Sequence, residues 1–178
     1  MELGEIEAIA AVIRRKWFMR RFAIALAALS VIALIAPTAA LAANVHFVKG
    51  PTFTDNGTTL TTSGKLAGLG NENVTITVAV KGIATKITCT NPGGNQAPGQ
   101  NKPGVTASGD QTINRNEIKN GSVNISVTTL EPAQLTAKQA GCPNNRWTAE
   151  IDDVDFTSAT ITVVQGGTIV FQETYDNL

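Results

Sequence analysis

The chain has 178 residues, with 14 basic and 14 acidic side chains, two cysteines and one histidine. The balanced charge argues against a nucleic-acid binder, because such proteins cluster Lys and Arg to neutralise phosphates. The only imidazole, His46, leaves common hydrolytic triads hard to build, and no G-x-S-x-G motif is present. We therefore expect a protein that is not an enzyme and needs no cofactor.

The N-terminal segment differs from the rest of the sequence. Residues 22–36 form an uncharged run rich in Ala, Leu and Ile, preceded by a group of basic side chains and followed by an Ala-x-Ala pattern. These features predict a secretory signal peptide over residues 1–42, although translation could begin at Met19 and the run could instead remain as a membrane anchor. After cleavage, residues 43–178 carry nine basic and eleven acidic side chains and are expected to form one secreted domain without a membrane segment.

Cys89 and Cys142 both lie in the part expected to be exported. An even number of cysteines in an oxidising compartment favours a disulfide bond. Zinc is the alternative, but a structural zinc site needs four ligands and only His46 is available to join the two thiolates. The sequence therefore predicts one disulfide and no metal site.

Short alternating runs predict antiparallel strands. In residues 74–80, valine or isoleucine occupies every second position and Thr or Ala the others, which is typical of a half-buried strand. Lys81-Gly82 then predicts a tight reversal into a second strand over residues 83–90.

Two further turns are marked by dipeptides that favour the positive backbone angles of tight hairpins, Asn120-Gly121 and Gly166-Gly167. No window after the leader has a helical apolar stripe, although residues 131–140 allow one short helical turn. About nine strands are predicted from ten candidate ranges, which are 45–48, 53–54, 59–66, 74–80, 83–90, 105–111, 122–129, 147–151, 157–165 and 168–174. The expected fold is all-β, an antiparallel β-sandwich of immunoglobulin-like or related Greek-key type.

Residues 91–104 read NPGGNQAPGQNKPG, with three prolines, four glycines and no large apolar side chain. This composition predicts a long surface loop without secondary structure, which would be either a binding element or a flexible connection. The candidate binding residues are its amide side chains, Asn95, Gln96, Gln100 and Asn101.

An acidic cluster contains Glu150, Asp152, Asp153 and Asp155. Alternation predicts that these side chains point outward around a turn or a strand edge, where they are solvated. The alternatives are a calcium site, and a hydrolase that uses Glu150, Asp152 or Asp155.

Trp147 is the only tryptophan after the leader, and it lies five residues beyond Cys142. Because β-sandwiches commonly bury a tryptophan against their disulfide, we expect Trp147 to pack in the core rather than to stack on a sugar.

The runs 64–70 and 89–96, with the closing hairpin, are similar to those of small secreted bacterial β-sandwich proteins, a resemblance that implies no catalytic or binding residue. The expected function is that of a secreted, non-enzymatic extracellular module that binds a cell-envelope component, a glycan or another protein through loop 91–104. The alternatives are a structural protein that self-associates through an exposed strand edge and, third, a carboxylate-dependent hydrolase.

Overall fold

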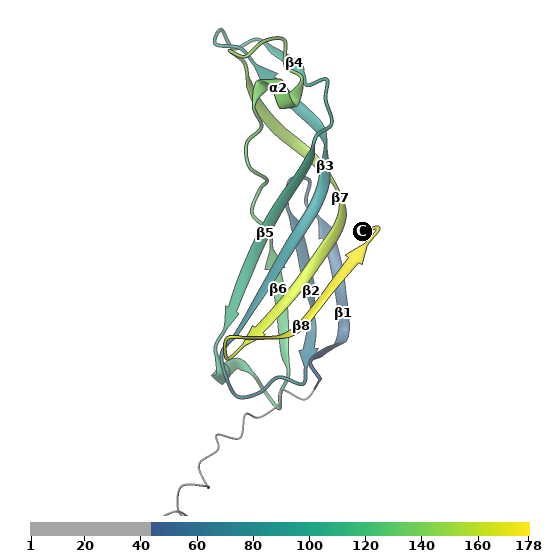
Figure 1. Ribbon diagram of the computed structural model, residues 1–178, viewed down its shortest axis with the longest axis vertical. Helices are drawn as coiled ribbons and strands as arrows, with labels where there is room; N and C mark the ends of the chain where they lie inside the picture. Colours follow the sequence, from purple (N-terminus) through teal and green to yellow (C-terminus); the bar gives the residue numbers. More distant parts are fainter. Residues whose placement is uncertain (1–43) are drawn as a thin grey trace, which may run out of the picture. The chain divides into compact units, whose positions relative to one another are not determined.

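Alternating side chains build strands along most of the part of the chain that the computed structural model describes, residues 44–178. The predicted signal peptide, residues 1–42, lies outside the described residues. The strands are β1 (His46–Asp55), β2 (Leu60–Ala67), β3 (Val74–Thr90), β4 (Gln96–Pro98), β5 (Gly104–Ile113), β6 (Val123–Thr128), β7 (Thr148–Gln165) and β8 (Thr168–Asp176), and the two helical turns are the 3-10 turn η2 (Arg115–Glu117) and α2 (Ala137–Ala140) (Figure 1). The predicted all-β fold and the helical turn within residues 131–140 are confirmed.

The strands form two sheets in which every pairing is antiparallel. One sheet has the order β1-β2-β6, and the other has the order β4-β3-β7-β8, with β5 also paired to β3. The chain crosses between the sheets after β2, after β5 and after β6, so β2 and β6 take the places of strands B and E, and β3, β7 and β8 those of C, F and G, in immunoglobulin-like sandwiches. The predicted Greek-key β-sandwich is therefore confirmed.

The hydrophobic core lies between the two sheets. Val74, Ile76 and Val78 of β3 are fully buried, which confirms the inward face predicted for residues 74–80. They belong to one cluster with the buried side chains of the other strands, among them Leu60, Leu66, Ile125, Val127, Ile161 and Val163.

The hairpin predicted at Lys81-Gly82 is wrong, because β3 runs without a turn through both residues. Gly82 pairs with Val105 on one side and Phe156 on the other. A Cβ atom on Gly82 would lie 2.6 Å from Val154 Cγ1, so the residue is a glycine because β7 passes close by rather than because the chain reverses.

Other pairs of predicted strands are also continuous. Residues 147–151 and 157–165 fall almost wholly within the single strand β7, and 45–48 and 53–54 almost wholly within β1. Each of β1, β3 and β7 thus joins two predicted ranges into one strand. With the unpredicted β4, residues 44–178 contain the eight strands observed.

The two predicted glycine turns are confirmed. Asn120 and Gly121 have φ values of 49° and 70°, and Lys119 and Ser122 on either side exchange backbone hydrogen bonds of 2.9 and 3.0 Å. Gly166 and Gly167 have φ values of 58° and 78° and join β7 to β8.

The β3–β7 ladder is longer than the three-stranded sheet that faces it. It runs from the pair Val74–Gln165 to the pair Thr90–Thr148, whereas β2 has eight residues and β6 has six. Near Thr90 and Thr148 the ladder is accompanied by β4 and α2 instead (Figure 1). We call the part formed by residues 84–104 and 131–154 the distal end.

The predicted disulfide is confirmed: Cys89 and Cys142 are bonded, with a Cα–Cα distance of 5.7 Å. It joins β3 to the segment between α2 and β7. The disulfide of antibody domains instead links strands B and F across the two sheets. Here the bond stabilises the distal end rather than bridging the central core.

Candidate functional site

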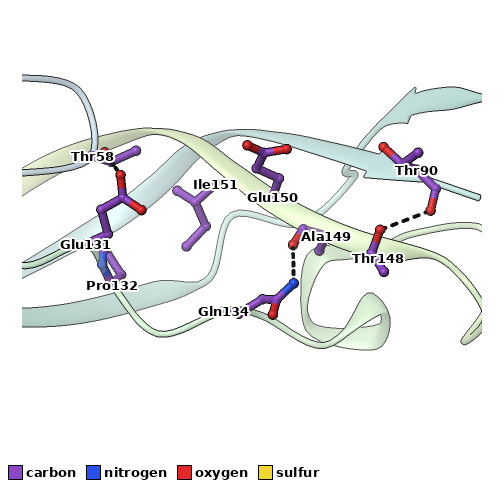
Figure 2. Close-up of a pocket in the computed structure, with 9 residues that line it drawn as sticks. All are labelled: Thr58, Thr90, Glu131, Pro132, Gln134, Thr148, Ala149, Glu150 and Ile151. Atoms are coloured by element: carbon purple, nitrogen blue, oxygen red, sulfur yellow. Dashed lines mark hydrogen bonds between the residues drawn. The ribbon is translucent and has the colours of Figure 1, made fainter. Parts of the chain in front are cut away.

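The distal end contains an open groove of about 370 Å³. It lies where β7 passes beside the segment between β6 and α2 (Figure 2). The lining residues are Thr58, Thr90, Glu131, Pro132, Gln134, Thr148, Ala149, Glu150 and Ile151.

Hydrogen bonds position several of these side chains. Thr58 Oγ1 donates to Glu131 Oε1 at 3.3 Å, at the left of Figure 2, and Thr148 Oγ1 donates to the Thr90 carbonyl oxygen at 3.3 Å, at the right. Between them, Gln134 Nε2 donates to the carbonyl oxygen of Ala149 at 3.5 Å. Of these three bonds, the one from Gln134 ties the segment between β6 and α2 to β7, the one to Glu131 ties that segment to the connection between β1 and β2, and the one from Thr148 joins β7 to β3.

The groove has a definite chemical character. Its polar side chains are two carboxylates, three hydroxyls and one amide, and none of its lining residues is basic. Because carboxylates accept hydrogen bonds and attract positive charge, the groove suits a ligand that donates hydrogen bonds, through hydroxyl or ammonium groups.

Loop 91–104 lies at the same end of the molecule and is more ordered than predicted. Residues Gln96–Pro98 form β4, which pairs with the end of β3. Gly99 N donates to the Ile87 carbonyl oxygen at 2.8 Å, and Ala84 N to the Pro103 carbonyl oxygen at 3.0 Å. The predicted absence of secondary structure is wrong, because these backbone bonds tie the loop to β3.

The four amide side chains predicted to bind ligand differ in their surroundings. Asn95, Gln96 and Gln100 are exposed, and Gln100 Nε2 donates to the Pro98 carbonyl oxygen at 3.1 Å. Asn101 Nδ2 instead donates to the carbonyl oxygens of Lys138 and Gln139, at 3.2 and 3.0 Å, so it caps the C-terminal end of α2. A role in ligand binding stays a prediction for all four residues. Asn101 has in addition the structural role of capping α2.

The acidic cluster lies within β7, so no turn is present there. It falls beyond the stretch that pairs with β8, where β7 is an edge strand. Asp152 and Asp153 are half-buried and accept hydrogen bonds of 2.7 Å from Thr88 and Thr85. Of the three carboxylates considered for hydrolysis, only Glu150 lines the groove.

The structure brings no metal-binding group together in the described residues: no cluster of three or more His, Cys, Asp or Glu side chains in 44–178 could hold an ion. His46 is exposed on β1, with Nδ1 2.7 Å from the Asn44 carbonyl oxygen. Trp147 is half-buried and packs against the hydrophobic core.

Part of the groove was not predicted from the sequence. Thr58, Glu131, Pro132 and Gln134 belong to connecting segments without side-chain alternation. Glu131, Pro132 and Gln134 become neighbours of Glu150 because the chain crosses from one sheet to the other after β6, and Thr58 reaches them from the connection between β1 and β2. No sequence signal available from a single chain would have assigned them.

No family model matches the sequence, and no curated protein matches it. Among solved structures, the chain is similar to a glycosyl hydrolase family 2 member from Bacteroides cellulosilyticus DSM 14838, with 11% identity and a TM-score of 0.32. The match covers 74% of this chain but only 15% of that much longer one, and at this level it carries no argument about function. Within the described part of the chain, no helix is long and apolar enough to cross a membrane.

Proposed function

We propose that this protein is a secreted, non-enzymatic binding module whose contact surface is the distal end, and that its partner is a cell-envelope component, either a glycan or a protein. The observation that carries the proposal is the acceptor-rich groove of about 370 Å³, which lies at the same end as the exposed amides of loop 91–104. Ligand sites are commonly concave, with a few polar groups on a scaffold that is already formed.

The construction of the distal end supports this role. The β3–β7 ladder supplies the floor of the groove, and β4, α2 and the disulfide fasten the segments around it. Sites held by regular elements and cross-links lose little conformational freedom when a ligand binds. Export is supported by the features of residues 1–42 and by the disulfide, which persists in oxidising compartments.

The experiment uses oxidised residues 43–178 in a glycan-array screen and in pull-downs from cell-envelope extracts. Two variants separate the groove from the loop: Glu131→Gln with Glu150→Gln, and Asn95→Ala with Gln96→Ala and Gln100→Ala. The matched control is Asp110→Asn with Asp155→Asn, which neutralises two exposed carboxylates outside the groove.

We expect the groove variant to bind about tenfold more weakly, because charge-assisted hydrogen bonds to both carboxylates are lost. The loop variant should show a smaller loss, and the control should bind as the unmodified protein does. Binding that survives both the groove and the loop variants would remove the distal end from consideration.

A further inference from the structure

The sheet edges of this sandwich are not equally protected against pairing with another chain. Along β1 the register shifts twice, and Pro51 has no amide to donate. The neighbouring edges of β5 and β6 cover each other, since Ser126 N donates to Gln111 Oε1 at 3.1 Å and Leu130 N to the Ser108 carbonyl oxygen at 2.9 Å. Register shifts, prolines and covered edges are the usual means by which proteins prevent edge-to-edge association.

β8 is the edge of the second sheet opposite β5, and its outer half lacks these protections. From Phe171 to Asp176 its register on β7 has no shift, and this stretch contains neither proline nor lysine. Phe171 and Tyr175 pack on Phe47 and Phe53 of β1, with ring centroids 5.6 and 5.4 Å apart, which holds the strand in place. The result is an ordered strand with an open edge.

The register defines which backbone groups of β8 are free. Asn177 N donates to the Thr157 carbonyl oxygen at 3.0 Å. Because hydrogen-bonded and non-hydrogen-bonded pairs alternate along an antiparallel ladder, Gln172, Thr174 and Asp176 direct their amides and carbonyls away from β7. All three residues are exposed.

These residues are complementary to themselves when a second β8 approaches in the antiparallel direction. We propose that β8 pairs with β8 of a second copy of this chain about a two-fold axis at Thr174. Thr174 then faces Thr174, Gln172 faces Asp176, and Glu173 faces Tyr175 of the other copy. The three pairs are hydroxyl with hydroxyl, amide with carboxylate, and phenol with carboxylate, so each pair joins a group that can donate to a group that can accept.

The protein pairs its own strands in the same way. The hydroxyls of Thr160 and Thr174 lie 2.9 Å apart across β7 and β8, and those of Thr61 and Thr128 lie 2.9 Å apart across β2 and β6. In the single chain, Tyr175 OH donates its one proton to Glu173 Oε2 within β8, and Gln172 Nε2 donates to Thr162 Oγ1 at 3.1 Å, so the phenol contact to the other copy exchanges a bond, whereas Gln172 keeps its second amide proton for Asp176. A second copy would extend the hydroxyl row from Thr160 through Thr174 into the other chain.

The interface would be small. The outward backbone groups form the three pairs Gln172–Asp176, Thr174–Thr174 and Asp176–Gln172, which supply about six backbone hydrogen bonds. Strands this short bury less surface than a standard stable interface. We therefore expect a reversible dimer that forms with rising concentration. Since β8 pairs with β7 only over residues 158–165, the distal end of each copy stays free, and this inference stands independently of the proposed function.

Sedimentation velocity of oxidised residues 43–178 over a wide concentration range tests the proposal. Gln172→Lys places a lysine opposite Asp176 in both pairs, and it should tighten the dimer about threefold. Gln172→Lys combined with Asp176→Lys places lysine opposite lysine twice, and it should weaken the dimer by about tenfold or more.

The matched control is Thr106→Lys with Asp110→Lys, two exposed residues with the same spacing on β5. It should leave dimerisation unchanged, and thermal unfolding of each variant checks that the fold is retained. The proposal is overturned if the protein and the Gln172→Lys variant are both monomeric throughout, or if a dimer forms that is indifferent to the charges at 172 and 176 or responds equally to the control.

Discussion

At the scale of single residues, two buried polar side chains show how differently such groups can be satisfied. Gln165 accepts from Gly70 N at 2.8 Å and donates to the carbonyl oxygens of Gly70 and Glu72, each at 3.0 Å. Thr62 is fully buried on β2, and within the described chain its hydroxyl oxygen has no hydrogen-bond partner. Removing a polar atom from water costs free energy, and for the Thr62 hydroxyl no hydrogen bond offsets that cost. For Gln165 the hydrogen bonds offset it, and they also tie the connection before β3 to the end of β7.

Thr62→Val is expected to raise the free energy of unfolding by about 1 kcal/mol, because it replaces an unpaired hydroxyl with a methyl group of similar size. Urea denaturation measures the change. The control is Thr61→Val, which removes a hydroxyl that bonds with Thr128 and accepts from Asn56, and which should lower stability by about 1 kcal/mol. A loss of stability in Thr62→Val would mean that its hydroxyl does find a partner.

Tyr175 gives a prediction about alkaline pH. Burial raises the pKa of this phenol, and the hydrogen bond to Glu173 and the negative charge of that residue raise the pKa further. An unfolded tyrosine titrates near pH 10, so the folded state holds its proton where the unfolded state loses it. The contribution of the protonated Tyr175 phenol to the free energy of unfolding is therefore complete below about pH 10 and is lost as the pH rises beyond that value.

Tyr175→Phe should therefore show a shallower fall in unfolding free energy than the unmodified protein between about pH 9 and about pH 11. Urea denaturation across this range checks the slope. Equal slopes in the two proteins would show that this phenol does not contribute to the pH dependence of stability.

At the scale of elements, β3 shows why a glycine in a strand is easily mistaken for a turn. The Asn120-Gly121 and Gly166-Gly167 turns need residues that tolerate positive φ at both positions. Gly82 needs no such freedom, since its φ is not positive. It is required because Val154 and Asp155 of β7 occupy the space where a side chain would stand.

Gly82→Ala is expected to lower the free energy of unfolding by about 2 kcal/mol, because the new methyl group meets Val154 Cγ1 and the backbone of Asp155. The matched control on the adjacent strand is Gly104→Ala, where the nearest atom to the new Cβ is 3.9 Å away. That variant should be within about 0.5 kcal/mol of the unmodified protein. If both variants unfold alike, close packing by β7 is not the reason for Gly82.

At the scale of the whole molecule, the disulfide compensates for the limited cover at the distal end. Most of its buried apolar side chains other than Cys89 are small: Ala84, Ala137, Ala140 and Ala149 are alanines, and only Ile87 and Val154 are larger. Alanines contribute little burial energy each. A covalent link is therefore a large part of what keeps β3, α2 and β7 together.

Replacing both cysteines, Cys89→Ala with Cys142→Ala, should lower the free energy of unfolding by about 4 kcal/mol. The disulfide joins residues 53 positions apart and restricts the unfolded chain, and the double variant loses this restriction. Urea denaturation with and without a reductant measures this loss. The reductant should destabilise the unmodified protein by a similar amount and leave the double variant unaffected. Equal stability of the oxidised and reduced proteins would contradict the assigned role.

The candidate site was predictable only in part. The amides of loop 91–104 stand out in the sequence because proline and glycine surround them, but nothing local reveals that Asn101 caps α2. Glu131 and Glu150 are separated along the sequence by the whole of α2 and its flanking segments, and they share a groove only in the folded chain. Which polar residues line a surface depends on contacts between distant segments.

The sequence alone determined the strand character, the inward face of β3, the two glycine turns and the cysteine pair, because side-chain alternation, tolerance of positive φ and thiol chemistry are properties of neighbouring residues or of residue type. The tertiary structure alone decided how long β3 and β7 run, which glycine is needed for packing, what Asn101 binds and which edge stays open. These depend on the approach of β7 to β3, of α2 to the loop and of β5 to β6, and such long-range contacts leave no periodic trace in the sequence.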